Sequence, residues 1–291
     1  MITLEQLQAG IVLPIDKPRQ WTSFQAVNKI KAVVRNTYGL KKFKIGHAGT
    51  LDPLATGLLL VCLGKATKSI PQLQDGDKVY TGTLVLGATT PCYDLEQAVD
   101  HYYPYEHITR ELLESTARQF TGTLMQVPPM FSAVKVDGQR AYEIARSGNG
   151  ERRTENGERR TENGEPRAKQ IQVYSFEITD FREGVAECKS GKVTEWQSDK
   201  VDSTTQPLSH SATQPLSHLY DHPQGTVPPH LPQADFRIHC GKGTYIRSLA
   251  RDLGLALGSG AFLSALRREQ VGDYTVDHAL QLDQVAEYLA G

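Results

Sequence analysis

Residues 45–68 read IGHAGTLDPLATGLLLVCLGKATK and place one acidic side chain, Asp52, in a Gly-rich segment that continues through Pro53 into an apolar run. A carboxylate beside buried apolar neighbours costs free energy unless it is paired or takes part in chemistry. The glycines permit backbone angles that other residues avoid, and Pro53 fixes its own φ, so the loop can hold Asp52 in one orientation. The segment matches neither G-x-x-x-x-G-K-[ST] nor G-x-G-x-x-G, which excludes both nucleotide-binding fingerprints. Asp52 is therefore either a turn residue or a catalytic group.

The charge of the chain is unevenly distributed. The formal net charge of the 291 residues is -1, but the stretch from Lys17 to Lys68 contains ten Lys and Arg residues against Asp52 alone. Such a surface suits an acidic polymer such as a nucleic acid. The alternative is an ordinary charged face in contact with solvent.

Composition indicates a cytoplasmic protein without a metal or disulfide framework. The four cysteines, Cys62, Cys92, Cys188 and Cys240, show no C-x-x-C spacing. The N-terminal segment lacks the pattern of a signal peptide, and no apolar run approaches the ~18 residues of a membrane helix. We expect reduced thiols, no metal and no membrane partner.

Two stretches differ from the rest of the chain and are predicted to be disordered insertions. Residues 148–168 contain ERRTENG twice in succession, and residues 190–233 contain TQPLSH twice among Ser, Thr, Pro, Gln and His. The histidines of the second stretch lack a rigid frame for a metal site. The remaining residues fit one domain spanning 1–291.

The body of the chain mixes helical and strand periodicity, so we expect an α+β fold. Thr22 and Gln25 form a capping-box pattern before a basic amphipathic helix with Phe24, Val27, Ile30 and Val34 at helical spacing. Residues 79–87 alternate as a strand that places Tyr80 on the face of Leu84 and Leu86. Further segments are predicted as helices at 109–120 and 245–257 and a strand at 235–240.

A second group of chemically useful residues lies in GKGTYIRSLARDLG, residues 241–254. It places Tyr245 and Arg247 at the start of a helix, where free N-H groups favour an anion. Arg247 could pair with a carboxylate and keep it ionised, as a nucleophile or general base requires. It could equally decorate the solvent face. A third segment, PPMFSAVKVDGQRAYEIAR at 128–146, offers Phe131 and Tyr142 either to RNA or to the core.

Taken together, these three segments resemble the TruB family of bacterial tRNA pseudouridine-55 synthases. The resemblance covers residues 45–68, 128–146 and 241–268 in the family's order, with the DKP segment at Asp16. It implies a pseudouridine-synthase-like central, mainly antiparallel mixed sheet flanked by helices and loops. The implied reaction converts a uridine of the tRNA T arm, position 55, to its C-glycoside isomer without a cofactor or metal.

The resemblance also assigns site residues. Asp52 matches the catalytic aspartate, Arg247 its arginine partner and Tyr80 the ring that stacks on the target base; His47, Tyr245 and Leu266 match residues that contact RNA or line the uracil pocket. Lys17 belongs to the basic surface expected to bind substrate. The catalytic step requires a flipped base, which needs a stacking surface. Attack on the sugar, attack on the base and proton removal at C2′ are all open roles for Asp52.

The chain departs from the family pattern at three places. Gln20 stands where a Gly is common, which affects the turn after DKP. Cys92 stands where Thr or Ser is usual. After Arg268 the tail has room for a strand and a helix, so we expect no C-terminal RNA-binding (PUA-like) domain, no guide RNA and a monomeric enzyme that holds tRNA with the catalytic body alone.

Two other functions fit part of the pattern. An RNA chaperone would need the same basic surface and stacking tyrosine but would have little use for Asp52. An aspartate-dependent hydrolase would explain the carboxylate, but it usually needs a second carboxylate or a metal, and no D-x-D or metal-ligand cluster lies near Asp52 in the sequence.

Overall fold

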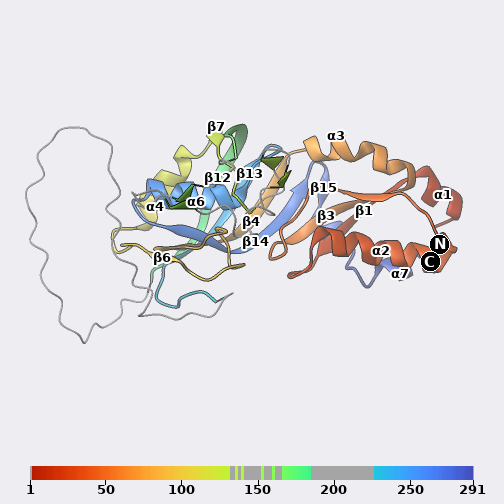
Figure 1. The fold of residues 1–291 in the computed structure, drawn as a ribbon, viewed down its shortest axis with the longest axis horizontal. Helices are drawn as coiled ribbons and strands as arrows, with labels where there is room; N and C mark the ends of the chain where they lie inside the picture. The colour runs from red at the N-terminus through yellow and green to blue at the C-terminus, as the bar shows by residue number, and fades with distance from the viewer. Residues whose placement is uncertain are drawn as a thin grey trace, which may run out of the picture.

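The computed structural model describes residues 2–131, 135–136, 139–140, 152–153, 159–160, 166–184 and 226–290. Helices and strands alternate along the chain, which confirms the α+β prediction (Figure 1). The helices are α1 (Leu4–Ala9), α2 (Ser23–Tyr38), α3 (Ile70–Asp75), α4 (Arg110–Gln119), α6 (Ile246–Ala256) and α7 (Val285–Ala290), with 3-10 turns η1 (Gly64–Ser69) and η2 (Val276–His278). The strands of the main sheet are β1 (Ile11–Lys17), β2 (Ile45–Ala48), β3 (Thr56–Leu63), β4 (Lys78–Leu86), β7 (Gly122–Gln126), β12 (Lys169–Arg182), β13 (Gln233–Cys240), β14 (Ala261–Val271) and β15 (Tyr274–Thr275).

The described strands of this sheet follow the order β1-β3-β14-β4-β13-β12-β7, with β2 beside β3 and β15 beside β14. All of these pairs are antiparallel except β3 and β14, which confirms the predicted mainly antiparallel mixed sheet. Short two-residue strands form separate pairs: β5 (Ala88–Thr89) with β6 (His101–Tyr102), β8 (Lys135–Val136) with β9 (Gln139–Arg140), and β10 (Arg152–Arg153) with β11 (Arg159–Arg160).

The main sheet narrows where β3 meets β14. Arg267 pairs with Thr56 and Arg268 with Gly57, and these two residue pairs are the whole register of the two strands. Gly57 has φ +96°, and a Cβ there would lie 2.4 Å from the Arg268 carbonyl oxygen, so this junction requires glycine. The junction joins a half that contains β1, β2 and β3 to a half that contains β4, β13, β12 and β7.

Both ends of the chain lie together at the far end of the first half, beside α1, α2 and α7 (Figure 1). The Tyr38 hydroxyl lies 2.8 Å from the carbonyl oxygens of Ile2 and Leu289 and so ties the two ends to α2. Helices α4 and α6 lie against the other half of the sheet.

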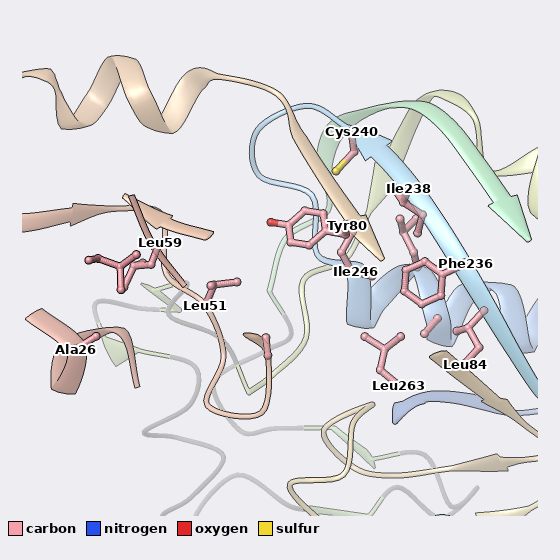
Figure 2. Packing of buried hydrophobic residues seen from close by; sticks show 14 of the residues in the cluster. Ala26, Leu51, Leu59, Tyr80, Leu84, Phe236, Ile238, Cys240, Ile246 and Leu263 are labelled. Carbon is pink, nitrogen blue, oxygen red and sulfur yellow. The ribbon is translucent and has the colours of Figure 1, made fainter. Parts of the chain in front are cut away.

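The buried face of β4 follows the predicted alternation. Tyr80 and Leu84 belong to one hydrophobic cluster with Phe236 of β13 and Ile246 of α6 (Figure 2). Tyr80 therefore lies at the edge of the core next to α6, and its ring is packed rather than free.

Helix α2 begins as predicted but buries a different set of side chains. Thr22 and Gln25 form the capping box, with the Thr22 amide 2.7 Å from Gln25 Oε1. The predicted core position Phe24 is wrong: its side chain is 68% exposed, and Ala26 takes its place beside Val27 and Ile30. The buried face continues through Ser23 and Ala26, which precede the buried Val27 and Ile30 by one helical turn, and so leaves Phe24 outside.

Most of the two predicted insertions, together with Tyr142 and Cys188, lies outside the described residues. The predicted end of the second insertion at Gln233 lies too far along the chain. Residues 226–232 are described, Leu231 is 2% exposed in a small cluster with Val85 and Phe262, and β13 already begins at Gln233. Pro166, near the end of the first insertion, is also buried. The predicted insertions included these ends because amino-acid composition carries no information on packing.

Candidate active site

Asp52 lies in the loop that connects the β2–β3 hairpin. The loop is fixed on the side of α2, where the Leu51 amide donates to Ser23 Oγ at 2.9 Å and the Ser23 hydroxyl donates back to the Leu51 oxygen at 3.2 Å. A turn then closes from the Ala55 amide to the Asp52 oxygen at 3.2 Å. Because its neighbours are clamped, the Asp52 side chain has a defined direction although it is 37% exposed.

Lys17 lies behind this loop and not on the predicted RNA-binding surface. Its side chain is fully buried, and Nζ donates to the backbone oxygens of Pro18 (3.0 Å), Trp21 (2.6 Å) and Pro53 (3.4 Å). Burial lowers the pKa of Lys17 to about 8, against the opposing charge of Asp52. In this place Lys17 can position the loop that carries Asp52, and a direct contact with a molecule in the cavity would require that loop to open.

Gln20 adopts the conformation that a glycine would take. Its φ is 67°, and its amide donates to the Pro53 oxygen at 2.8 Å. Gln20 therefore occupies this turn with a left-handed backbone angle, which costs free energy in a residue with a Cβ.

The guanidinium of Arg247 grips Asp52 at two atoms. Nε lies 2.9 Å from Asp52 Oδ2 and Nη2 lies 3.1 Å from Oδ1. The same group donates to the backbone oxygens of Cys92 at 3.1 Å and Phe131 at 2.8 Å. Arg247 is 4% exposed. A two-pronged contact of this kind fixes the plane of the carboxylate as well as its charge.

Asp94 is a second carboxylate near the same guanidinium, and it approaches the Nε that also contacts Asp52. Its Oδ2 is 3.7 Å from Arg247 Nε, and its Oδ1 accepts the Glu96 amide at 2.9 Å. Burial raises the pKa of Asp94, and the charge of Arg247 opposes the rise. Burial disfavours the charge of Arg247, but Asp52 and then Asp94 outweigh it and raise the arginine pKa. The sequence shows no D-x-D pattern near Asp52, and Asp94 comes near the ion pair only through the fold.

An open cavity of about 590 Å³ begins at this ion pair. Its walls are contributed by the loop of Asp52, by β4, by the first turn of α6 and by β14. The predicted residues Asp52, Tyr80, Tyr245, Arg247 and Leu266 all line it. Gln126 fixes Tyr245 at this wall, because its side chain accepts the Tyr245 amide at 2.8 Å and donates to the Tyr245 oxygen at 3.1 Å.

His47 lies on β2, outside the lining of this cavity. Burial lowers its pKa; a hydrogen bond to the Gly49 backbone opposes this effect and the charge of Arg268 adds to it. The imidazole therefore favours its neutral form. His47 stands beside the loop rather than among the groups that surround the Asp52 carboxylate.

Three polar residues of the site were not predicted from the sequence: Asp94, Gln126 and Arg268. Arg268 is a buried residue of β14 that lines the cavity with Tyr80. Lys17 was predicted on the surface, but strand alternation offered a signal for its burial. Every second residue of β1 faces the core, and Lys17 follows Leu13 and Ile15 in that series. Asp94 and Gln126 carried no such signal, since their partners come from distant segments.

No three His, Cys, Asp or Glu side chains lie close enough to hold a metal ion in the part of the chain that the structure describes. Among the same residues, no helix is long and apolar enough to cross a membrane. The three cysteines within the described ranges, Cys62, Cys92 and Cys240, are free and buried.

Comparison with known proteins agrees with the arrangement of these segments. Residues 35–194 match the profile of the TruB family pseudouridylate synthase N-terminal domain, and residues 247–290 match that of a tRNA pseudouridylate synthase B C-terminal domain. A tRNA pseudouridine synthase B of Flavobacterium johnsoniae is 43% identical over 99% of this chain and 100% of its own length. One of Phocaeicola vulgatus is 41% identical over 96% and 93%.

Among solved structures, a chain of a Cbf5-Nop10-Gar1 complex superposes with a TM-score of 0.57 at 24% identity. The match covers 97% of this chain and 55% of that chain. An archaeal box H/ACA Nop10-Cbf5 complex gives a TM-score of 0.54 at 22% identity, over 97% and 54%. At this identity the two likenesses establish the fold.

Proposed function

This chain belongs to the TruB family of pseudouridylate synthases, and on that premise we propose that it isomerises the T-arm uridine of tRNA, position 55, with Asp52 as the catalytic carboxylate. The enzyme is a tRNA-modifying isomerase. The observation that carries the proposal is the ion pair in which two nitrogens of Arg247 contact the Asp52 carboxylate. This ion pair lines the same cavity as Tyr80 and Leu266.

The reaction needs a place for a nucleotide that has left its stack. The N1–C1′ bond must break, the detached uracil must rotate, C5 must bond to C1′, and the C5 hydrogen must leave. A confined space with an aromatic wall suits these steps, because a flipped base loses its stacking partners and regains them on a protein ring. Tyr80 would supply that wall, and Leu266 would bound the space on the side of β14.

The Asp52–Arg247 contact supports the role of Asp52. A buried guanidinium that uses two nitrogens on one carboxylate stabilises the anionic form and leaves it in a fixed orientation. Each of the three reaction routes considered above starts from such an anion. An RNA chaperone would gain nothing from this arrangement, which favours catalysis.

We also propose that the enzyme recognises tRNA without a guide RNA and acts as a monomer. The relatives that match over nearly their full length are bacterial proteins named tRNA pseudouridine synthase B, and the complexes with Cbf5 share the fold at 22–24% identity. Full turnover by the purified chain, at the mass of one chain in light scattering and with no added RNA except a T-arm transcript, would support both points.

The test uses a T-arm transcript with tritium at C5 of its uridines, incubated with protein in chelator. Tritium is released only when C5 bonds to the sugar and loses its hydrogen. Release by the wild type and none by Asp52→Asn would support both the reaction and the carboxylate. The matched control is Asp283→Asn, which changes an exposed carboxylate near the C-terminus. No release by the wild type, or equal release by Asp52→Asn, would overturn the proposal.

A further inference from the structure

Arg268 is among the largest fully buried side chains of the protein and is 2% exposed. It lies at the junction of the two half-sheets, where it is paired across strands with both Gly57 of β3 and Tyr80 of β4. Burial of an arginine is costly unless its charge and its five N-H donors are satisfied. The charge and the donors of Arg268 must therefore be satisfied by groups inside the protein.

The guanidinium donates to two backbone oxygens, and its strand neighbour is the predicted stacking residue Tyr80. Nε donates to the Leu58 oxygen at 2.7 Å, and Nη2 donates to the Gly49 oxygen at 3.1 Å. Tyr80 pairs with Arg268 across β4 and β14 and lines the same cavity, and the charge of Arg268 opposes the larger effect of burial that raises the pKa of the Tyr80 hydroxyl. Figure 2 shows this hydroxyl directed away from α6, toward the side of the molecule that carries Leu51 and Leu59.

No carboxylate forms an ion pair with Arg268 in the described ranges. The positive charge of Arg268 instead contributes to the lowered pKa values of Lys17, His47 and Lys78. In each case burial has the larger effect. A structural arginine would be expected to have an acidic partner. Here the unneutralised charge faces the cavity that Asp52 lines.

These contacts join the two halves of the candidate site. Gly49 begins the loop that carries Asp52, and a Cβ at Gly49 would lie 3.3 Å from Arg268 Nη1. Tyr80 belongs to the opposite half of the sheet. Arg268 thus connects the start of the Asp52 loop, through its side chain, to the strand pair that carries Tyr80, through its backbone.

We propose that Arg268 is a positioning residue that fixes the Asp52 loop relative to the Tyr80 ring. The proposal rests on the function proposed above. A base stacked on Tyr80 must meet the Asp52 carboxylate at a reactive distance, and a displacement of about 1 Å can cost about 10²-fold in rate. Arg268 holds that distance through its hydrogen bond to the Gly49 oxygen and its place beside Tyr80 in the β14–β4 pair.

The experiment compares Arg268→Gln and Arg268→Lys with Arg267→Gln. Arg267 is the matched control because it is the next residue of β14, yet it faces away from this cavity and grips Asp16 at 3.0 and 2.8 Å. Tritium release at saturating T-arm RNA gives kcat, and fluorescence titration of the same RNA gives Kd. Circular dichroism reports whether each variant is folded.

We expect Arg268→Gln to lower kcat about 10²-fold while Kd changes less than about threefold. Arg268→Lys keeps the charge but loses the fork, so its kcat should fall similarly. The NMR-measured pKa of His47 should stay low in Arg268→Lys and rise in Arg268→Gln. Wild-type kcat in either folded Arg268 variant would overturn the proposal, and if Arg268→Gln does not fold, Arg268→Lys alone decides.

A readout without RNA separates this inference from the proposed function. Amide hydrogen exchange of residues 49–52 should be faster in Arg268→Gln than in Arg267→Gln. If wild-type protein releases no tritium, the proposed function fails, while exchange still tests the tie between Arg268 and the loop. Unchanged exchange in Arg268→Gln would overturn the inference even in an active enzyme.

Discussion

Arg247 Nε lies 2.9 Å from Asp52 Oδ2 while the arginine is 4% exposed, so the Asp52 carboxylate, which lines the cavity together with Tyr80, is held by a cation 195 residues further along the chain. A lysine cannot reproduce this contact, because a single ammonium cannot serve Asp52 and the two backbone oxygens of Cys92 and Phe131 in one plane. The geometry of the guanidinium, and not its charge alone, is expected to matter.

Arg247→Lys should therefore lower kcat about 10²-fold with the protein still folded. Single-turnover tritium release measures the effect. Arg251→Lys is the control, since Arg251 lies one turn further along α6 and pairs with Asp252 at 2.7 Å. Equal losses in the two variants would contradict a specific role for the Arg247 fork.

Asp94→Asn should reduce kcat by about tenfold, a loss of about 1.4 kcal/mol of transition-state stabilisation. Asp94 and Asp52 both approach Nε of Arg247, at 3.7 and 2.9 Å, so neutralising Asp94 removes one of the two charges that hold the guanidinium in place. The loss should be smaller than in Asp52→Asn, because Asp94 acts through the arginine. Wild-type single-turnover rates in Asp94→Asn would show that Asp52 alone orients Arg247.

Gln20→Gly should stabilise the protein by about 1 kcal/mol, because a left-handed φ costs roughly 1–2 kcal/mol for a residue with a Cβ and less for glycine. The φ of Gln20 is 67°. Urea unfolding measures the change. Arg19→Gly is the control: Arg19 is not among the described residues with positive φ, so glycine there should destabilise. A lower unfolding midpoint in Gln20→Gly would mean that the Gln20 side chain contributes more than its backbone angle costs.

Lys17 should make the free energy of unfolding rise with pH above about 8. Its pKa is lowered by burial from 10.5 to about 8, so between these values the unfolded chain keeps a proton that the folded chain has released. Deprotonation in that window therefore favours the folded state. The difference in urea midpoint between wild type and Lys17→Met should grow from pH 8 to 10, and Lys29→Met, at an exposed site on α2, should show no such trend. Parallel profiles for all three proteins would refute this.

The sequence predicted those parts of the site that lie inside continuous motifs. The Gly-rich stretch around Asp52 and the helix start at Arg247 carry their own local signals, and the strand alternation placed Tyr80 in the core correctly. Lys17 was misplaced because a count of charges along the chain says nothing about burial. In the fold it ends β1 on the inward face, where three backbone oxygens replace water.

Asp94 and Arg268 could not be found in this way, because the sheet register determines their partners. Asp94 reaches the site through a bridge to Leu263, next to a register shift in β14. Arg267 and Arg268 are consecutive residues of β14, so their side chains point to opposite faces of the sheet. No local pattern tells which of the two arginines points inward. Non-local pairing of this kind appears only once the half-sheets are assembled.

Lys242 lies at the rim of the cavity and pairs across it with Asp75 at 2.9 Å; both side chains are exposed. An exposed pair contributes about 0–1 kcal/mol, so Lys242→Gln should leave the urea midpoint nearly unchanged. Because Lys242 is an exposed cation at the cavity, we expect it to contact a phosphate of bound RNA. Removing one phosphate contact should weaken T-arm binding and reduce the slope of log K against log salt by about 1.

Arg110→Gln is the matched control for Lys242→Gln, because Arg110 also sits in an exposed ion pair, with Glu114 at 2.9 Å, but does not line the cavity. Its binding curve should superimpose on that of the wild type at every salt concentration. If both variants lost affinity equally, the effect would come from net charge. If Lys242→Gln bound like the wild type, the RNA backbone would have to enter by another side of the cavity.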